Sequence, residues 1–254
     1  EYTINHNYSI SSHPDAMSPT RDEAVRSAIS YSVDKEYIIN NILEGNANRI
    51  DYPILPAWQS WWPDPPYPHR YNLTRAIEIL NDRGFIDIDG NGWLNYPPDW
   101  PGAAGADTTE YPLRIVFRID DPIRYEIGMY LVSQMESVGF ATEPIACTSE
   151  QVYEIVFLNK DYHVYIGSWD LGNVYPPVYL RPAYHSSFWC TSNIVLPPSL
   201  PYSHEIDEYL DRAYFANYPD GAEGAKHYIQ LFCKAHFNHT VTIPLAAPRV
   251  LEYW

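Results

Sequence analysis

A run of alternating strand and helix patterns between residues 112 and 169 most narrowly limits the fold of this chain. The segment "PLRIVFRID" alternates in the manner of a strand, with Leu113, Ile115 and Phe117 on one side. A helical period follows over residues 121–139, and then come the strand "FATEPIAC", the helix "SEQVYEIVFLN" and the strand "DYHVYIGSW". This order predicts two right-handed crossovers and an α/β fold with a mostly parallel sheet flanked by helices.

The end of the last predicted strand is a candidate binding site, because ligands of such sheets bind beyond the carboxyl ends of the strands. Trp169 and Asp170 lie at this end, in the segment "GSWDLGNVYPPVYL" (167–180), which we interpret as a rigid loop. Trp169 would supply apolar contact area and Asp170 a directional acceptor, with Asn173 and Tyr175 as supporting polar groups. The other interpretation is a core tryptophan followed by a turn-forming aspartate.

A second loop is rich in proline and tryptophan. The segment "DYPILPAWQSWWPDPPYPHRYN" holds six prolines, a density that excludes helix and central strand. Trp58, Trp61 and Trp62 within it have two possible roles, either to fasten the loop to the body of the protein or to contact a ligand. We include Trp58 among the candidate ligand-binding residues.

Capping patterns predict where other helices begin. Thr20 and Glu23 have the spacing of a capping box, and Ser149 is the expected cap of the helix "SEQVYEIVFLN". Further helices are predicted over residues 73–83, about 205–217 and about 221–236.

An acidic turn and three cysteines raise the question of metals and disulfides. Asp87, Asp89 and Asn91 match the first half of a calcium loop, but the twelfth position, where a bidentate Glu is needed, is Pro98. A turn built from Asp, Gly and Asn is the simpler account, so we expect no metal and no cofactor. The odd number of cysteines leaves the disulfide pairing open between Cys147, Cys190 and Cys233.

The charge of the chain limits its partners. The formal net charge is −16, with 16 basic and 32 acidic residues. Nucleic acid and anionic membrane surfaces both bind basic patches, so we expect neither as a partner. No stretch reaches the roughly 18 apolar residues of a membrane span, and no signal peptide opens the chain, as expected of a mature or trimmed form.

Five segments in order resemble one known family. They are "RDEAVRSAISYSVDKEYIINNILEGNA", "RAIEILNDRGFIDIDGNGWL", "MESVGFATEP", "HEIDEYLDRAYFA" and "HTVTIPL", and they span about residues 20–247. Together they are similar to the family 5 extracellular solute-binding proteins, which are the oligopeptide-, dipeptide- and nickel-binding receptors of ABC importers.

The resemblance implies a fold and a function. Full members have two lobes around a cleft, and residues 1–254 resemble a single periplasmic-binding-protein type II-like lobe, with crossover strands near residues 1–6 and 241–254. The expected function is to capture a peptide-like or other small solute in the inter-lobe cleft. The full-length protein would be a monomer that serves ABC transporter permease subunits. It would be extracellular or periplasmic and anchored to the membrane.

One position departs from the peptide-binding pattern of the family. In those members an aspartate three residues after the tryptophan pairs with the α-amino group of the peptide, whereas here that position is Gly172 and Asp170 follows Trp169 directly. Pro176 matches the proline of the family. A carbohydrate receptor is therefore the alternative function, along with a sensory or structural surface module of the same fold.

An enzyme is the rival class. Carboxylates such as Asp64, Glu154 and Asp170 exist, but nothing in their spacing pairs them as a glycoside hydrolase requires. The segment "YHSSFW" places His185 beside Ser186, and residues adjacent in a chain rarely form a catalytic triad. No nucleophile-elbow, zincin or P-loop motif occurs. We therefore expect no enzymatic activity.

Overall fold

The chain divides into two compact units in the computed structural model, which describes residues 1–64, 70–168, 174–216 and 221–249. The sheet unit comprises Tyr2–Asp34 and His69–Gly167. The helical unit comprises Glu1, Lys35–Pro68 and Ser168–Trp254. The expectation that residues 1–254 form one lobe of a larger protein stays a prediction.

A mostly parallel sheet forms the centre of the sheet unit, as predicted. Its central strand, β3, pairs in parallel with β4 and β5, while β1 pairs antiparallel with β5, which gives the order β4-β3-β5-β1. The strands are β1 (Tyr2–Ile4), β3 (Leu113–Arg118), β4 (Thr142–Cys147) and β5 (Val164–Ile166). Leu113, Ile115 and Phe117 are fully buried, so the alternation seen in the sequence marks the core side of β3.

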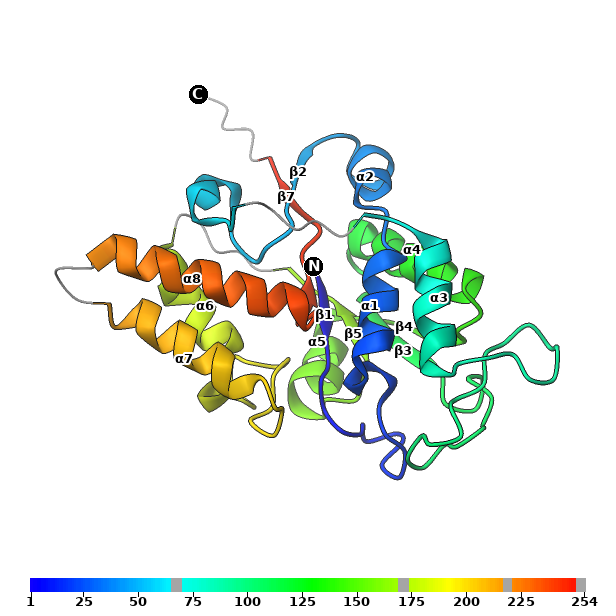
Figure 1. Cartoon of the computed structure of the whole chain (residues 1–254). Coiled ribbons are helices and arrows are strands. Elements are labelled where there is room, and N and C mark those ends of the chain that lie inside the picture. The colour runs from blue at the N-terminus through cyan, green and yellow to red at the C-terminus, as the bar shows by residue number, and fades with distance from the viewer. Residues whose placement is uncertain (65–69, 169–173, 217–220, 250–254) are drawn as a thin grey trace. The chain divides into compact units, whose positions relative to one another are not determined.

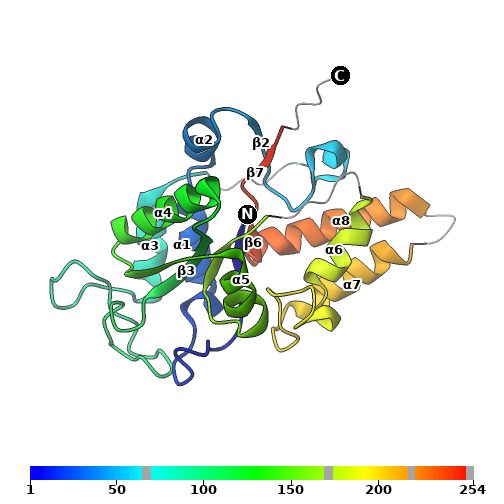
Figure 2. The ribbon, with the colours of Figure 1, turned by 180° about the vertical axis from the view of Figure 1, so that it is seen from behind.

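Helices flank this sheet. They are α1 (Glu23–Tyr31), α3 (Leu73–Arg83), α4 (Pro122–Ser137) and α5 (Ser149–Val152), with the short 3-10 helix η1 (Pro19–Arg21) and the π-helical segment η4 (Tyr153–Leu158) that continues α5. Helices α1 and α3 lie side by side in both views (Figures 1 and 2). Gly128 brings α4 against β3 so closely that a Cβ at this position would lie 2.4 Å from the Phe117 ring.

Two predicted helix caps are wrong. Asp22, and not Thr20, caps α1 by accepting the Ala24 N–H at 2.8 Å. The Thr20 hydroxyl instead donates to the carbonyl of Asn5 at 2.6 Å, a tertiary contact that the local pattern cannot reveal. Thr148, one residue before the predicted Ser149, caps α5 in a capping box with Gln151.

The acidic turn after α3 is held by its own backbone. Asp87 accepts the N–H groups of Gly90 and Gly92 at 2.8 and 2.9 Å, and Asp89 accepts that of Asn91 at 3.1 Å. Among the described residues, no group of three or more His, Cys, Asp or Glu side chains is placed to hold a metal ion. The geometry therefore matches the turn interpretation of Asp87, Asp89 and Asn91.

Helices dominate the helical unit. Helices α7 (Ser203–Tyr214) and α8 (Gly221–Asn238) lie side by side, and α6 (Pro176–Tyr184) packs against α7 (Figures 1 and 2). The short strands β2 (Ala47–Arg49) and β7 (Ala246–Pro248) pair antiparallel. The remaining elements are α2 (Lys35–Tyr37), η2 (Ile38–Ile42), η3 (Pro56–Trp61), η5 (Ser186–Phe188) and β6 (Thr242–Ile243).

Helix α6 corrects the interpretation of residues 167–180 as a loop. Its first two residues are Pro176 and Pro177, which fit the first helical turn because the N–H groups of that turn have no partner within the helix. The three cysteines are free thiols, with Cys147 and Cys233 buried and Cys190 exposed. No helix in the described part of the chain is long and apolar enough to cross a membrane.

Candidate functional site

The carboxyl ends of the strands in the sheet unit are the expected position of a ligand-binding site. Beyond β3, Ile119 is 56% exposed and Asp120 receives two hydrogen bonds from Arg118, at 2.8 and 2.9 Å. These hydrogen bonds lower the pKa of the Asp120 carboxyl, so both side chains stay charged. The edge thus presents an apolar side chain beside a fixed, solvated ion pair.

Beyond β5 the chain leaves the sheet through Gly167. A Cβ at this position would lie 3.0 Å from the Thr3 hydroxyl and 3.2 Å from the Tyr165 ring, so a larger residue would crowd both. Ser168 follows and is exposed. The predicted ligand-binding residues Trp169, Asp170 and Asn173 lie outside the described residues, and their role stays a prediction.

The other two predicted site residues meet in the helical unit. The rings of Trp58 and Tyr175 lie edge to face with centroids 5.9 Å apart, and Trp61 lies 5.2 Å from Tyr175 and 5.8 Å from Trp58. Trp58 and Trp61 belong to η3, whereas Tyr175 is the residue before α6. We call these three residues the surface aromatic cluster.

Three hydrogen bonds fasten the proline-rich loop behind this cluster. The Tyr179 hydroxyl of α6 donates to the Pro53 carbonyl at 3.3 Å, and the Gln230 amide of α8 donates to the Trp62 carbonyl at 3.1 Å. Within the loop, the Trp62 indole donates to the Ile54 carbonyl at 3.3 Å. The Trp62 side chain thus stabilises the loop internally, whereas its main-chain carbonyl connects the loop to α8.

The cluster combines apolar area with two polar groups. Tyr175 is 36% exposed, Trp58 is half-buried and Trp61 is buried. Partial burial raises the pKa of the Tyr175 hydroxyl, which therefore remains a neutral phenol at physiological pH. The Trp58 indole nitrogen has no hydrogen-bond partner among the described residues. Such a surface can pack against an uncharged group and offer it the Tyr175 hydroxyl as a directional donor.

Sequence reasoning identified Trp58 and Tyr175 separately but did not include Trp61. The available signal was its place in the same proline-bounded tryptophan run. Trp61 is buried and contacts both other rings, so it supports them on the side that faces the protein.

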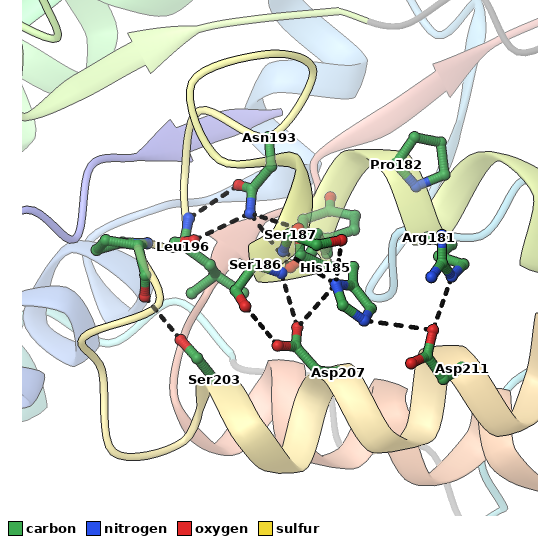
Figure 3. A network of polar contacts seen from close by, with 12 residues as sticks. Arg181, Pro182, His185, Ser186, Ser187, Asn193, Leu196, Ser203, Asp207 and Asp211 are labelled. Atoms are coloured by element: carbon green, nitrogen blue, oxygen red, sulfur yellow. Dashed lines mark hydrogen bonds and ion pairs between the residues drawn. The ribbon is translucent and has the colours of Figure 1, made fainter.

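The segment "YHSSFW" does not form a catalytic triad (Figure 3). Ser186 bonds to Asp207 through both its N–H and its hydroxyl, whereas Ser187 bonds to His185. Nδ1 of His185 already accepts the Ser187 N–H, and the N–H groups of Phe188 and Trp189 donate to carbonyls within the turn. These residues therefore offer neither a free general base nor an oxyanion hole.

The chain belongs to the bacterial extracellular solute-binding proteins of family 5, whose model matches residues 2–189. The proteins of this family and the relatives of this chain are solute-binding proteins and not enzymes.

Individual relatives agree with this assignment. The oligopeptide-binding protein AppA of Bacillus subtilis (strain 168) is 23% identical over 169 residues, which is 66% of this chain and 29% of AppA. NikZ from Campylobacter jejuni, solved with Ni(L-His), superimposes with a TM-score of 0.72 at 20% identity, covering 91% of this chain and 42% of NikZ. The mannohexaose-bound periplasmic oligopeptide-binding protein from Thermotoga maritima superimposes with a TM-score of 0.75 at 16% identity, covering 96% of this chain and 43% of that protein.

These structures establish the periplasmic-binding-protein type II fold. The chain spans less than half the length of the solved structures that it resembles.

Proposed function

We propose that this chain supplies part of the solute-binding surface of an ABC importer's extracellular receptor. The observation that carries the proposal is the surface aromatic cluster, in which Trp58 and Tyr175 come from distant parts of the sequence and both retain exposed area. Aromatic rings of this kind give a large contact area with little loss of side-chain entropy. Membership of the solute-binding family supports the same function.

The solute class follows from the lining of the cluster. Its three side chains are uncharged at neutral pH, so they suit a peptide-like or other small solute through its apolar and carbonyl groups. The predicted contributions of Trp169, Asp170 and Asn173 would add a carboxylate acceptor. Within the full-length protein, the partner would be the permease subunits of the transporter, and the receptor would be monomeric and anchored to the outer face of the membrane.

A binding screen on the full-length protein tests this proposal. Thermal unfolding would be followed with peptides of two to nine residues, mannohexaose and nickel–histidine, the kinds of ligand bound by relatives. A ligand that binds only the folded protein raises the melting temperature with concentration. We expect one of these classes to do so, and no shift with any of them would contradict the proposal.

Two variants then localise the binding. Trp58→Ala and Tyr175→Ala should each lower the affinity for the solute by roughly tenfold or more, as loss of a buried aromatic contact implies. Trp93→Ala and Tyr8→Ala are matched controls, because Trp93 is half-buried and Tyr8 is 52% exposed and both belong to the sheet unit. Equal losses of affinity in the variants and the controls would mean that the cluster is not part of the binding surface.

A further inference from the structure

His185 stands where two helical segments meet (Figure 3). It follows α6, and its side chain caps the turn η5, which begins at Ser186. Its Nδ1 lies 3.0 Å from the Ser187 backbone nitrogen and 2.9 Å from the Ser187 hydroxyl. The residue is 8% exposed, so these contacts with protein groups replace most of its contact with water.

The cap fixes which ring nitrogen holds the proton. A backbone N–H can only donate, so Nδ1 must present its lone pair to Ser187, and the neutral ring carries its proton on Nε2. Nε2 is buried 3.3 Å from Asp211 Oδ1 without a well-formed hydrogen bond. The neutral ring therefore caps η5 with one nitrogen and faces a carboxylate with the other.

Two carboxylates and one cation surround the ring. Asp207 and Asp211 both come from α7, and Asp207 Oδ1 lies 3.5 Å from Nδ1. Arg181 of α6 donates to Asp211 at 2.7 Å. Burial raises the pKa of Asp211, but the hydrogen bond from Arg181 and the nearby His185 ring outweigh it and lower that pKa, so Asp211 remains ionised.

We propose that His185 is a pH-sensitive lock on the turn η5. Binding of a proton from solvent at Nδ1 converts the ring to imidazolium, in which both nitrogens are donors and neither can accept the Ser187 N–H. Nδ1–H then turns to Asp207, which has lone pairs to spare beyond those used by Ser186. The cap is lost and the turn opens, while the two carboxylates stabilise the new charge.

The opening is confined to the turn. Asn193 is fully buried and donates to the carbonyls of His185 and Leu196 at 3.1 and 3.0 Å, which holds the backbone on both sides of η5. Phe188, whose ring lies 5.3 Å from the Arg181 guanidinium, is the side chain in the turn that would move. Solute binding at the surface aromatic cluster is not required for this response.

Amide hydrogen exchange at Ser187 tests the lock. In the 254-residue protein, NMR would follow the His185 ring signals and the Ser187 exchange rate, corrected for intrinsic exchange, over the histidine range of about pH 8 to 5. We expect the protection of Ser187 to fall roughly tenfold, as loss of a capping bond implies, with the same midpoint as the ring titration. Constant protection while the ring titrates would overturn the proposal.

Two variants separate titration from structure. In His185→Asn the amide oxygen can still accept the Ser187 N–H but does not titrate, so protection should stay constant with pH. Asp207→Asn keeps an acceptor for Ser186 and removes the charge beside Nδ1, so the transition should move to lower pH. If His185→Asn lost protection with pH in the same way as the wild type, the proposal would be overturned. If either variant failed to fold, the titration of the wild-type protein would still test the proposal.

Discussion

Two aromatic clusters in this chain have similar ring spacing and different exposure. In the sheet unit, the core aromatic cluster of Phe85, Tyr96, Trp100 and Phe140 has ring centroids 5.1–6.0 Å apart, and each residue is at most 1% exposed. In the surface aromatic cluster the spacing is 5.2–5.9 Å, but Tyr175 and Trp58 reach solvent. Ring geometry alone therefore does not distinguish a structural cluster from a binding surface.

The polar groups make the distinction. In the core aromatic cluster, the Trp100 indole donates to the Met17 carbonyl at 2.9 Å and the Tyr96 hydroxyl to the Tyr111 carbonyl at 2.6 Å. In the surface aromatic cluster, the Trp58 indole has no partner among the described residues. A buried donor normally finds an acceptor within the fold, so the buried Trp58 nitrogen without a partner sets this cluster apart from the fully hydrogen-bonded core aromatic cluster.

The largest difference should appear on truncation. Trp100→Ala should lower the free energy of unfolding by about 3–5 kcal/mol, because it removes a fully buried ring and leaves a cavity. Trp58→Ala should cost no more than about 2 kcal/mol, since part of its ring is already in water. Urea denaturation of both variants measures this, and equal costs would make Trp58 a core residue.

Acid should weaken both units without affecting the surface aromatic cluster. Burial, with a smaller effect of Arg114, lowers the pKa of His163 in the sheet unit to about 3, and burial with Lys35 nearby does the same for His236 in the helical unit. Both rings are neutral when folded, whereas in the unfolded chain a histidine gains its proton near its ordinary pKa of about 6.5. Stability is therefore present above that pH and is lost as the pH falls toward 3.

The magnitude can be measured per histidine. Between pH 7 and pH 5 the free energy of unfolding should fall by about 2 kcal/mol for each buried ring. His163→Asn and His236→Gln place a side-chain amide near the ring nitrogen that bonds to Arg114 N–H or to the Thr242 hydroxyl, without a titrating group, and each should flatten the slope by that amount. Over the same range, solute affinity at Trp58 and Tyr175 should stay constant; a parallel loss of affinity would mean that a titrating group takes part.

Two glycines near Trp100 test how tightly the core aromatic cluster is enclosed. Gly102 and Gly105 both have positive φ, at +77° and +71°, so alanine strains either one. A Cβ at Gly102 would lie 1.9 Å from the Asp15 carbonyl oxygen, whereas one at Gly105 would meet nothing within 4 Å. Gly102→Ala should therefore cost about 1–3 kcal/mol more than Gly105→Ala in thermal unfolding. Equal costs would show that the turn can shift away from Asp15.

Hydrophobic periodicity and local capping patterns predicted the elements whose sequence pattern is set by burial or by a local turn. The alternation in β3 and the helical period of α4 predicted both elements, because burial on one face imposes the pattern. Helix α3 was predicted with its bounds, since Gly84 adopts the left-handed conformation that ends it. The Thr20 cap failed because a hydroxyl can be taken by a distant carbonyl, here that of Asn5.

The candidate site was only half accessible from sequence. Trp58 and Tyr175 could each be nominated from local composition, but no pattern links the proline-rich loop to the residue before α6. The proline-rich loop is held beside α6 by two long-range hydrogen bonds, which the side chains of Tyr179 and Gln230 donate from different helices. The lock at His185 depends equally on α7, whose two carboxylates approach the ring only in the folded unit.

The smallest predicted effect discriminates most finely between the two clusters. Tyr96→Phe leaves the partly buried Tyr111 carbonyl without its donor and should cost about 1 kcal/mol. Tyr175→Phe keeps the ring contacts with Trp58 and Trp61, and in the described part of the chain its hydroxyl has no hydrogen-bond partner, so its unfolding free energy should change by less than about 0.5 kcal/mol. Urea denaturation resolves this difference, whereas a solute titration of Tyr175→Phe reports whether the phenol itself contacts the ligand. A stability loss at Tyr175 equal to that at Tyr96 would mean that its hydroxyl is part of the fold and not of a binding surface.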